Sequence, residues 1–391
     1  MAGKIIKIKA IIISTLAIVL FTVAFCFQSF TANANEKTFT IFVGNKTYEL
    51  SGKELGYYNG KVFIKCLDGV VDGIFYDTAV FPIDATIKFS PNTNGVFSFT
   101  REKVGKGIDK DKLIEDINEA LSKNIMQVNA SIIQLKPSVT VEELKKFTHK
   151  LASFSTYYAL SSENRKHNIK LASEKINGKI LKSGEEFSFN KTVGERREEN
   201  GFLPATVIEN GEFLEGVGGG VCQVSTTIYN CALLSGLKTT ERHAHSLVPS
   251  YIEPSFDAMV SWETCDLKFK NTTSGNLYIK AVANGETLTF TFYGEKPTAV
   301  YERVSETHEV VSPPEIEIIK DDKMPFGKTL TIRQSKNGLK SSAYLVVTER
   351  GVERSIKLHT DSYKAVRGKI MVGTQSVDNV ERSFVDKTDN I

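Results

Sequence analysis

A run of glycines places the tightest constraint on how this chain folds. Residues 216–220 read GVGGG, and the sequence VCQVSTTIYNC follows directly. Glycine loses more conformational freedom on folding than any other residue, so the run favours a turn over a helix or a strand. After it, Val224, Ile228 and Cys231 recur on one helical stripe. The pattern predicts a tight turn that leads into a helix, with Cys222 at the helix start.

Much of the remaining chain alternates apolar and polar residues with a period of two. The segments KTFTIFVGNKTYEL, GKVFIKCLDGVV and DATIKFSPNTNGVFSFT lie between residues 36 and 100, with Gly, Asn or Asp at their breaks. This alternation is typical of β-hairpins, and it places Cys66 inside a strand as a packed thiol. Asn337–Gly338, between two further β-runs, predicts another hairpin.

Helical patterns interrupt these strands. The segment DKDKLIEDINEALSKNI repeats apolar residues at three and four, and TVEELKKFTHKLASFSTYY is predicted to be a charged helix. Strands and helices together predict an α+β fold, and 391 residues favour several domains. The expected order is a leader or anchor at 1–34, a mixed α/β module at 36–150, an α+β domain at 151–297, a small all-β module at 298–375 and a polar tail at 376–391.

The first 34 residues resemble an export signal. Three lysines precede the uncharged stretch 10–27, and Ala32-Asn33-Ala34 offers a small-x-small cleavage site. The stretch is at the lower limit for a membrane span, so a cleaved signal peptide and a retained anchor both stay open. Either one predicts an exported protein, with the membrane as a partner only if the segment is retained.

Charge and cysteine spacing exclude several classes of function. The three lysines of the leader account for the whole formal charge of +3, and 46 basic residues then balance 46 acidic ones. A balanced chain lacks the basic footprint of nucleic-acid binding. The five cysteines include no C-x-x-C pair, which argues against structural zinc. We therefore expect no nucleic-acid partner, no metal and no cofactor.

Cys222 has two interpretations at this point. The dipole and the unpaired N–H groups of a helix start lower the pKa of a thiol, and the thiolate is the reactive form. The same N–H groups, with those of the glycine turn, can hold an oxyanion, which suits acyl transfer. A small core residue that closes a tight turn fits the sequence as well. Cys231, on the apolar stripe, is expected to be core.

Two histidines and two aspartates downstream are candidates to activate the thiol. His243 and His245 are two residues apart, so an extended backbone places them on one face, and either can pair with Cys222. Asp257 and Asp266 follow, and either can orient an imidazole. Residue order alone does not choose among them.

At these residues the chain resembles the VanW domain, a family named for an accessory protein of some vancomycin-resistance gene clusters. The resemblance spans roughly residues 151–297 and rests on the ordered blocks NRKHNIKLAS, INGKIL, GEEFSFNKTVGERREENGF, GGGVCQVSTTIYN, ERHAHS, SYIEPSFDAMVSW and DLKFKN. Ser183 stands where proline is usual, and Ser255 where glycine is usual. Both are interpreted as loop variants.

The flanking regions resemble cell-wall modules. Residues 36–150 look like a peptidoglycan-binding module often found before VanW domains, through GVFSFTREKVGKGIDKDKLIEDINEAL. Residues 298–375 are similar to the G-five module, through KMPFGKTLTIRQSKNG and GKIMVGTQ.

The resemblance implies an L,D-transpeptidase, which joins peptidoglycan stem peptides between two diaminopimelate residues. A tetrapeptide stem is then the donor and a diaminopimelate amine the acceptor. Cys222 is the implied nucleophile, His245 the favoured base and His243 the second choice, while Asp257 orients the ring. The better-known L,D-transpeptidases carry an S/T-H-G-C block, which this chain lacks. Residues expected at the substrate or oxyanion are Gly218, Gly219, Gly220, Gln223, Ser225 and Thr226.

Two other functions remain open from sequence. The chain can be a non-catalytic protein that binds the cell wall, in which the glycine turn is only a fold element. It can also be a cysteine L,D-carboxypeptidase, in which water instead of an amine resolves the thioester. All three place the protein in the cell wall or on the outer face of the membrane.

Overall fold

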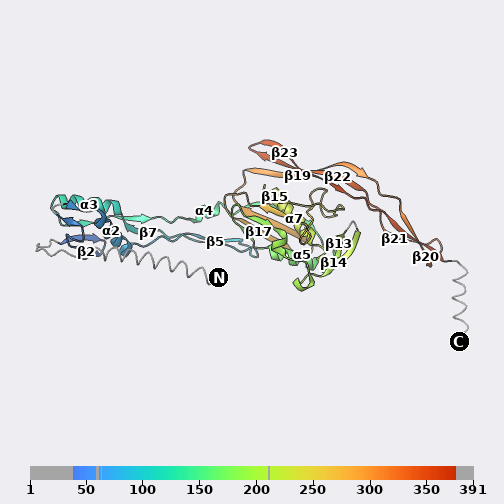
Figure 1. Ribbon diagram of the computed structural model, residues 1–391, viewed down its shortest axis with the longest axis horizontal. Coiled ribbons are helices and arrows are strands. Elements are labelled where there is room, and N and C mark those ends of the chain that lie inside the picture. The colour runs from blue at the N-terminus through green and yellow to red at the C-terminus, as the bar shows by residue number, and fades with distance from the viewer. Residues whose placement is uncertain (1–37, 59–60, 63, 210–211, 376–391) are drawn as a thin grey trace, which may run out of the picture. The chain divides into compact units, whose positions relative to one another are not determined.

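The computed structural model describes residues 38–58, 61–62, 64–209 and 212–375, and it has the predicted α+β class (Figure 1). The expected leader and polar tail lie outside the described residues. Within the described part, no helix combines the length and hydropathy needed to cross a membrane. The chain divides into two compact units, Met1–Thr86 with Thr100–Val141 and Ile87–Phe99 with Glu142–Ile391.

The first unit packs two helices against a small sheet. The predicted hairpin of β1 (Phe39–Val43) and β2 (Lys46–Leu50) forms, and β8 (Gln127–Asn129) adds in parallel to β1. Helix α3 (Lys110–Ser122) forms where its periodicity predicts, and the Asp109 carboxylate caps it by accepting from the Lys112 N–H. The other elements are β3 (Tyr57–Tyr58), β4 (Lys61–Val62), α2 (Ile64–Thr78), β7 (Gly105–Ile108) and β9 (Ile132–Leu135).

The strand predicted around Cys66 is wrong, because this segment is helix α2. Leu67, Val71 and Ile74 follow one another at intervals of four and three, and all three are buried in the same cluster as Leu113 of α3. A helical face of that width is buried more completely against α3 than an alternating strand would be. Cys66 therefore lies on a helix.

A hairpin early in the chain belongs to the second unit. Strands β5 (Thr86–Phe89) and β6 (Phe97–Thr100) pair as predicted. The rings of Phe89 and Phe97 lie 5.2 and 5.0 Å from the ring of Tyr278, which explains why residues 87–99 group with the later part of the chain.

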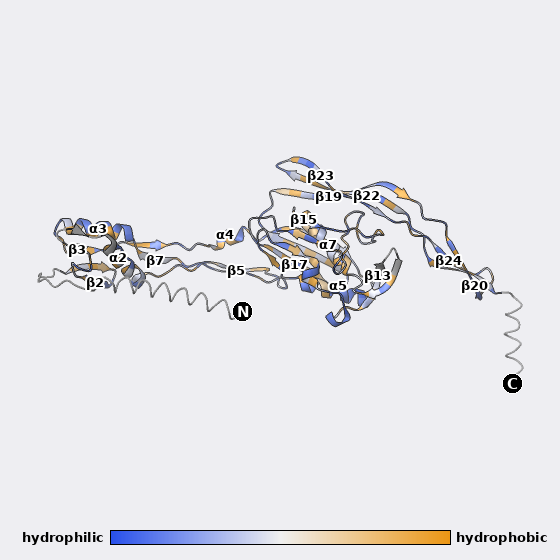
Figure 2. Ribbon diagram, viewed as in Figure 1, coloured by the Kyte–Doolittle hydropathy of each residue, from blue (hydrophilic) through white to orange (hydrophobic). Residues whose placement is uncertain are grey.

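The second unit is built around helix α7 (Val221–Leu234), which forms directly after the glycine run and is buried along most of its length. Helix α7 packs on the sheet β10-β18-β17-β11 and beside helix α5 (Glu163–Ile176). Figure 2 shows that the strands near β17 are rich in hydrophobic residues. Around them lie β10 (His149–Tyr157), β11 (Ile180–Leu181), β12 (Glu186–Ser188), α6 (Phe189–Val193), η1 (Glu198–Asn200), β13 (Pro204–Glu209), β14 (Glu212–Val217), β15 (Lys238–Glu241), β16 (Lys268–Lys270), β17 (Leu277–Ala283) and β18 (Thr287–Gly294).

The charged helix predicted at residues 140–158 is mostly a strand. Only α4 (Val141–Lys145) is helical, and β10 begins at His149. β10 pairs antiparallel with β18, more than 130 residues later, which the local sequence does not reveal. The pairing gains a full ladder of backbone hydrogen bonds, which outweighs the helical tendency of the segment.

The C-terminal strands share a core with the central domain. Ala343, Leu345 and Val347 of β22 lie in the same buried cluster as helix α7, so the expected boundary at residue 297 does not separate compact units. The strands here are β19 (Ala299–Val311), β20 (Glu317–Pro325), β21 (Thr329–Arg333), β22 (Gly338–Glu349), β23 (Val352–Tyr363) and β24 (Lys369–Gln375), in the sheets β19-β22-β23 and β20-β24-β21.

The hairpin predicted at Asn337–Gly338 is wrong. β21 pairs with β24, whereas β22 turns into β23 through Arg350 and Gly351. Those two residues have φ values of 51° and 80°, as a two-residue hairpin of type I′ requires.

Candidate active site

The glycine run forms a turn that brings the start of α7 to a cavity. Gly218 and Gly220 have φ values of 88° and 103°, which side-chain-bearing residues rarely adopt. Buried Asn168 holds the turn by donating to the Gly219 carbonyl over 3.0 Å. The backbone N–H groups of Gly220 and Cys222 donate to no carbonyl among the described residues. Both residues line the cavity, so these N–H groups are candidates for an oxyanion hole.

Buried polar side chains fix the position of α7. Gln223 donates to the Thr156 hydroxyl and to the Tyr157 carbonyl, both over 3.0 Å. Asn230 donates to the Phe256 carbonyl over 2.8 Å. Since an unsatisfied buried polar group costs about 1–3 kcal/mol, these bonds hold the helix in one register.

Ser225 and Thr226 do not take the expected place at the substrate. Both are fully buried and neither lines the cavity. The Ser225 hydroxyl donates to the Ala258 carbonyl over 2.5 Å, and the Thr226 hydroxyl accepts from the Ala258 N–H over 3.0 Å. They face inward because the segment after Asp257 packs against that side of α7. Gly218, Gly219, Gly220 and Gln223 do line the cavity.

The two candidate histidines point to different places. His245 is buried and lines the cavity with Cys222. His243 is not among the lining residues, and its Nε2 lies 3.0 Å from a carboxylate oxygen of Glu241. The expectation of one shared face is wrong, because β15 ends at Glu241 and the backbone beyond it makes only an isolated bridge from His243 to Met259.

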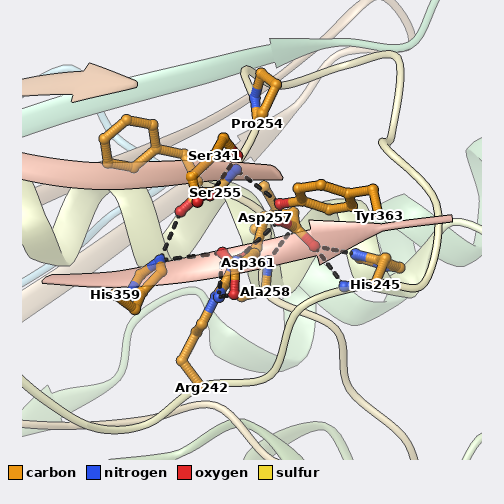
Figure 3. Close-up of polar contacts among 12 residues, drawn as sticks. Arg242, His245, Pro254, Ser255, Asp257, Ala258, Ser341, His359, Asp361 and Tyr363 are labelled. Carbon is orange, nitrogen blue, oxygen red and sulfur yellow. Dashed lines mark hydrogen bonds and ion pairs between the residues drawn. The ribbon is translucent and has the colours of Figure 1, made fainter. Parts of the chain in front are cut away.

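Asp257 orients the His245 ring. Its Oδ2 lies 2.6 Å from His245 Nδ1 and accepts from the His245 backbone N–H over 2.7 Å. Its Oδ1 accepts from the Tyr363 hydroxyl over 2.6 Å and from Arg242 Nη2 over 2.9 Å (Figure 3). A carboxylate with four donors stays ionised and can only accept, so Nδ1 carries the ring proton. The other ring nitrogen, Nε2, is then left for Cys222.

The environment stabilises the charged form of all three groups. Burial acts to raise the pKa of Cys222, but a hydrogen bond with His245, its charge and the nearby Arg196 hold that pKa below the ordinary thiol value. Burial acts to lower the pKa of His245, but Asp257 and Cys222 raise it to about 9. Although burial acts against it, His245 and Arg242 lower the pKa of Asp257 to about 2. The site favours a thiolate beside an imidazolium.

Strand β23 of the C-terminal region completes this arrangement. Asp361 accepts two hydrogen bonds from Arg242 Nη1, over 2.7 and 2.8 Å. The Tyr363 hydroxyl accepts from the Ser255 N–H over 2.7 Å and donates to Asp257 (Figure 3). Both β23 residues therefore hold Asp257, directly or through Arg242.

Ser255 is a buried part of this network, which corrects its interpretation as a loop variant. Its φ of 65° is left-handed, which explains why glycine suits the position. Its hydroxyl lies 2.7 Å from the Ser341 hydroxyl, so hydrogen bonds from the C-terminal sheet hold the strained backbone.

The remaining candidates have structural places. The Asp266 carboxylate accepts from the Ser188 hydroxyl over 2.5 Å and from the Asn190 N–H over 2.9 Å, at the start of α6. Cys231 is fully buried, and burial raises its thiol pKa far above the ordinary range. Cys222, Cys231 and Cys265 are all free thiols. Within the described residues, no group of His, Cys, Asp or Glu is arranged to hold a metal.

Cys222 opens into a cavity of about 520 Å³. A second cavity of about 540 Å³ shares Arg165, Thr206, Gln223 and Tyr251 with the first. The two cavities therefore adjoin each other, and Cys222 lines the first of them.

Sequence reasoning missed Arg165, Arg196, Arg242, Asp361 and Tyr363. Arg242 was within reach of sequence reasoning, because it directly precedes His243 in the block ERHAHS. Asp361 and Tyr363 carry no such signal, because they lie more than 100 residues after Asp257 and in a different predicted domain.

Replacing Tyr363 by phenylalanine should weaken the site without removing it. The variant loses one donor to Asp257 and leaves the Ser255 N–H without its acceptor, so we expect a stability loss of about 1–3 kcal/mol. Acylation of Cys222 should slow by about tenfold as the Asp257–His245 pair loosens. Urea unfolding and intact-mass kinetics measure the two effects. Tyr344→Phe, on neighbouring β22, is the control, and equal effects of both variants would contradict the role of Tyr363.

Three family models match the chain in the order that the sequence predicted. The model described as "Putative peptidoglycan binding domain" matches residues 64–130, "VanW like protein" matches 164–293 and "G5 domain" matches 301–375. The chain therefore contains a VanW-like domain followed by a G5 domain. This combination indicates a protein associated with the cell wall.

Two curated relatives match by sequence. YoaR of Bacillus subtilis (strain 168) is 38% identical over 146 residues, which cover 37% of this chain and 48% of YoaR. Vancomycin B-type resistance protein VanW of Enterococcus faecalis (strain ATCC 700802 / V583) is 30% identical over 146 residues, which cover 36% of this chain and 53% of that protein. The chain thus spans about half the length of these relatives. Among solved structures, the IgA1 protease G5 domain is 17% identical with a TM-score of 0.15, over 21% of this chain and 95% of that one.

Proposed function

We propose that this VanW-domain protein is a cysteine L,D-transpeptidase of peptidoglycan stem peptides. The observation that carries the proposal is the Asp257–His245 pair, whose imidazole lines the same cavity as the Cys222 thiol. This thiol has a lowered pKa, and the ring beside it holds a proton ready to donate. This is the arrangement that nucleophilic acyl transfer needs.

The first half of the reaction forms a thioester. The Cys222 thiolate attacks the carbonyl carbon of the third stem residue, and the carbonyl oxygen becomes an oxyanion near the N–H groups of Gly220 and Cys222. The C–N bond then breaks, and the departing amine of D-alanine takes the proton from His245. The products are the acyl-enzyme and free D-alanine, with a neutral imidazole.

The second half transfers the acyl group. The amine of a diaminopimelate side chain attacks the thioester carbonyl and gives a proton to His245. The C–S bond breaks, and a new amide cross-links the two stems. The thioester conserves the energy of the original amide, so the reaction needs no nucleotide. The second cavity, which shares four lining residues with the Cys222 cavity, supports transfer over hydrolysis, because it offers room for the acceptor stem.

The product that the full-length protein forms from a disaccharide-tetrapeptide tests this proposal. We expect a cross-linked dimer and free D-alanine, which mass spectrometry of the muropeptides detects. A tripeptide monomer with D-alanine would identify a carboxypeptidase instead. Intact substrate that is retained on a pull-down would identify a binding protein. The same proposal predicts that the protein is exported and attached to the cell wall. Surface labelling of intact cells tests both expectations.

A further inference from the structure

Two guanidinium groups line the Cys222 cavity on either side of the glycine turn. Arg165 comes from α5, and Arg196 follows α6. A Cβ at Gly220 would lie 2.9 Å from Arg165 Cγ, and a Cβ at Gly218 would lie 2.8 Å from Arg196 Cβ. The glycines therefore do more than form the turn. They let both arginines approach the nucleophile.

Neutral groups hold both arginines. Arg165 donates from Nη1 to the Ser161 hydroxyl and from Nη2 to the Gln223 amide oxygen, both over 2.7 Å. Arg196 donates from Nη2 to the Asn190 amide oxygen over 2.6 Å and from Nη1 to the Gly194 carbonyl over 3.2 Å. These contacts orient each guanidinium group. Each one keeps further N–H donors that the contacts do not use.

Neither guanidinium pairs with a carboxylate in the described part of the chain. Glu195 is the acidic residue among the cavity's lining residues, and its carboxylate pairs with Arg197 over 2.5 Å. Buried Arg242, by contrast, is neutralised by Asp257 and by Asp361. The charge of the Cys222 thiolate favours both half-buried cations, but a carboxylate bound in two hydrogen bonds is the partner that a guanidinium fork fits best.

We propose that Arg165 and Arg196 form a carboxylate-binding subsite that selects acyl donors with free carboxylates beside the reacting carbonyl. This inference rests on the proposed function for its substrate. A tetrapeptide stem has one carboxylate on its C-terminal D-alanine and a second on the side chain of diaminopimelate, so the two carboxylates flank the amide that breaks. A donor with amidated carboxylates loses these contacts.

A pair of small electrophiles tests the subsite without any peptide. Iodoacetate and iodoacetamide both alkylate Cys222 as the thiolate displaces iodide, but only iodoacetate carries a carboxylate. We expect the ratio of their rate constants at Cys222, iodoacetate over iodoacetamide, to exceed the ratio on the unfolded chain by about tenfold, the gain of one charge-assisted hydrogen bond. Peptide mapping of the full-length protein gives both rates. An unchanged ratio in the folded protein would overturn the subsite, and this measurement needs no variant.

Arginine variants separate substrate binding from simple stabilisation of the thiolate. Arg165→Gln and Arg196→Gln should each lower the iodoacetate rate by about tenfold relative to the iodoacetamide rate. Arg354→Gln, on an exposed arginine of β23 that does not line the cavity, is the control and should leave the ratio unchanged. If both probes slow equally in the two variants, the arginines act only on the thiolate and the proposal fails.

Peptide donors connect the subsite to the proposed reaction. A tetrapeptide with free carboxylates should acylate Cys222 with a KM about tenfold lower than the same peptide amidated at the diaminopimelate side chain, at similar kcat. Arg165→Gln or Arg196→Gln should remove that difference. Turnover of both peptides with equal KM would reject the subsite and leave the transpeptidase intact. A raised alkylation ratio without turnover of either peptide would support the subsite and reject the transpeptidase.

Discussion

The Cys222→Ser variant should form no acyl-enzyme and no cross-linked product. His245 and Arg196 lower the pKa of the Cys222 thiol, so the thiolate is available for attack. A serine hydroxyl stays protonated beside the same His245. We expect the rate of dimer formation to fall on the order of 10⁴-fold or more. Intact-mass spectrometry during turnover checks the acyl-enzyme, and muropeptide separation checks the product.

The matched control is the same chemical change at a thiol of the first unit. Cys66 lies on α2 in the first unit. The Cys66→Ser variant should form the cross-linked dimer at the rate of the unmodified protein. Thermal melts of both variants show whether either one is misfolded. Dimer formation by Cys222→Ser at a rate near that of the unmodified protein would exclude thioester chemistry.

The Asp257→Asn variant should lower acylation by about 10³–10⁴-fold. An asparagine can donate to Nδ1 of His245, which permits the wrong tautomer and removes the charge that supports the imidazolium. It also leaves Arg242 with one carboxylate, Asp361, in place of two. Single-turnover acylation measures the loss, and Asp322→Asn on the exposed face of β20 is the control. Near-normal acylation in Asp257→Asn would show that Asp257 does not support His245.

The pH dependence of alkylation gives a second readout for Asp257. In the unmodified protein, the pKa of Cys222 is lowered and the pKa of His245 is raised to about 9. The thiolate–imidazolium pair is therefore present at pH values between these two pKa values. Iodoacetamide should therefore react with Cys222 at pH values below the ordinary thiol pKa of about 8.5. Without the Asp257 charge, the pKa of His245 falls, and the thiolate loses the stabilisation that the imidazolium gives it. The pH midpoint of alkylation should therefore move to a higher value. A midpoint that does not move would indicate that Asp257 has no electrostatic role.

The prediction of Cys222 at a helix start rested on local physics. The glycines before Cys222 and the apolar stripe after it depend on residues within about four positions, which is the range over which a helix start is decided. The structure accordingly has α7 where the sequence placed it. The same holds for α3, whose periodicity spans three turns and does not depend on a distant partner.

Predictions failed where a distant segment decided the outcome. Residues 149–157 are a strand because β18 pairs with them, and the strand around Cys66 gave way to a helix because α3 covers its apolar face. Short apolar runs fit either structure, so the partner chooses between them.

The sequence by itself determined the helix that carries Cys222, the candidates His245 and Asp257, and the order of the domains. Only the tertiary structure decided which candidates meet. His243 and His245 look alike in sequence, but only His245 lines the cavity with Cys222, whereas the His243 ring lies against Glu241. Asp257 gains the Tyr363 hydroxyl as a donor, and Arg242 gains Asp361 as an acceptor, only when β23 packs beside them, because hydrogen bonds across more than 100 residues depend on how the sheets assemble and leave no periodic trace in the chain.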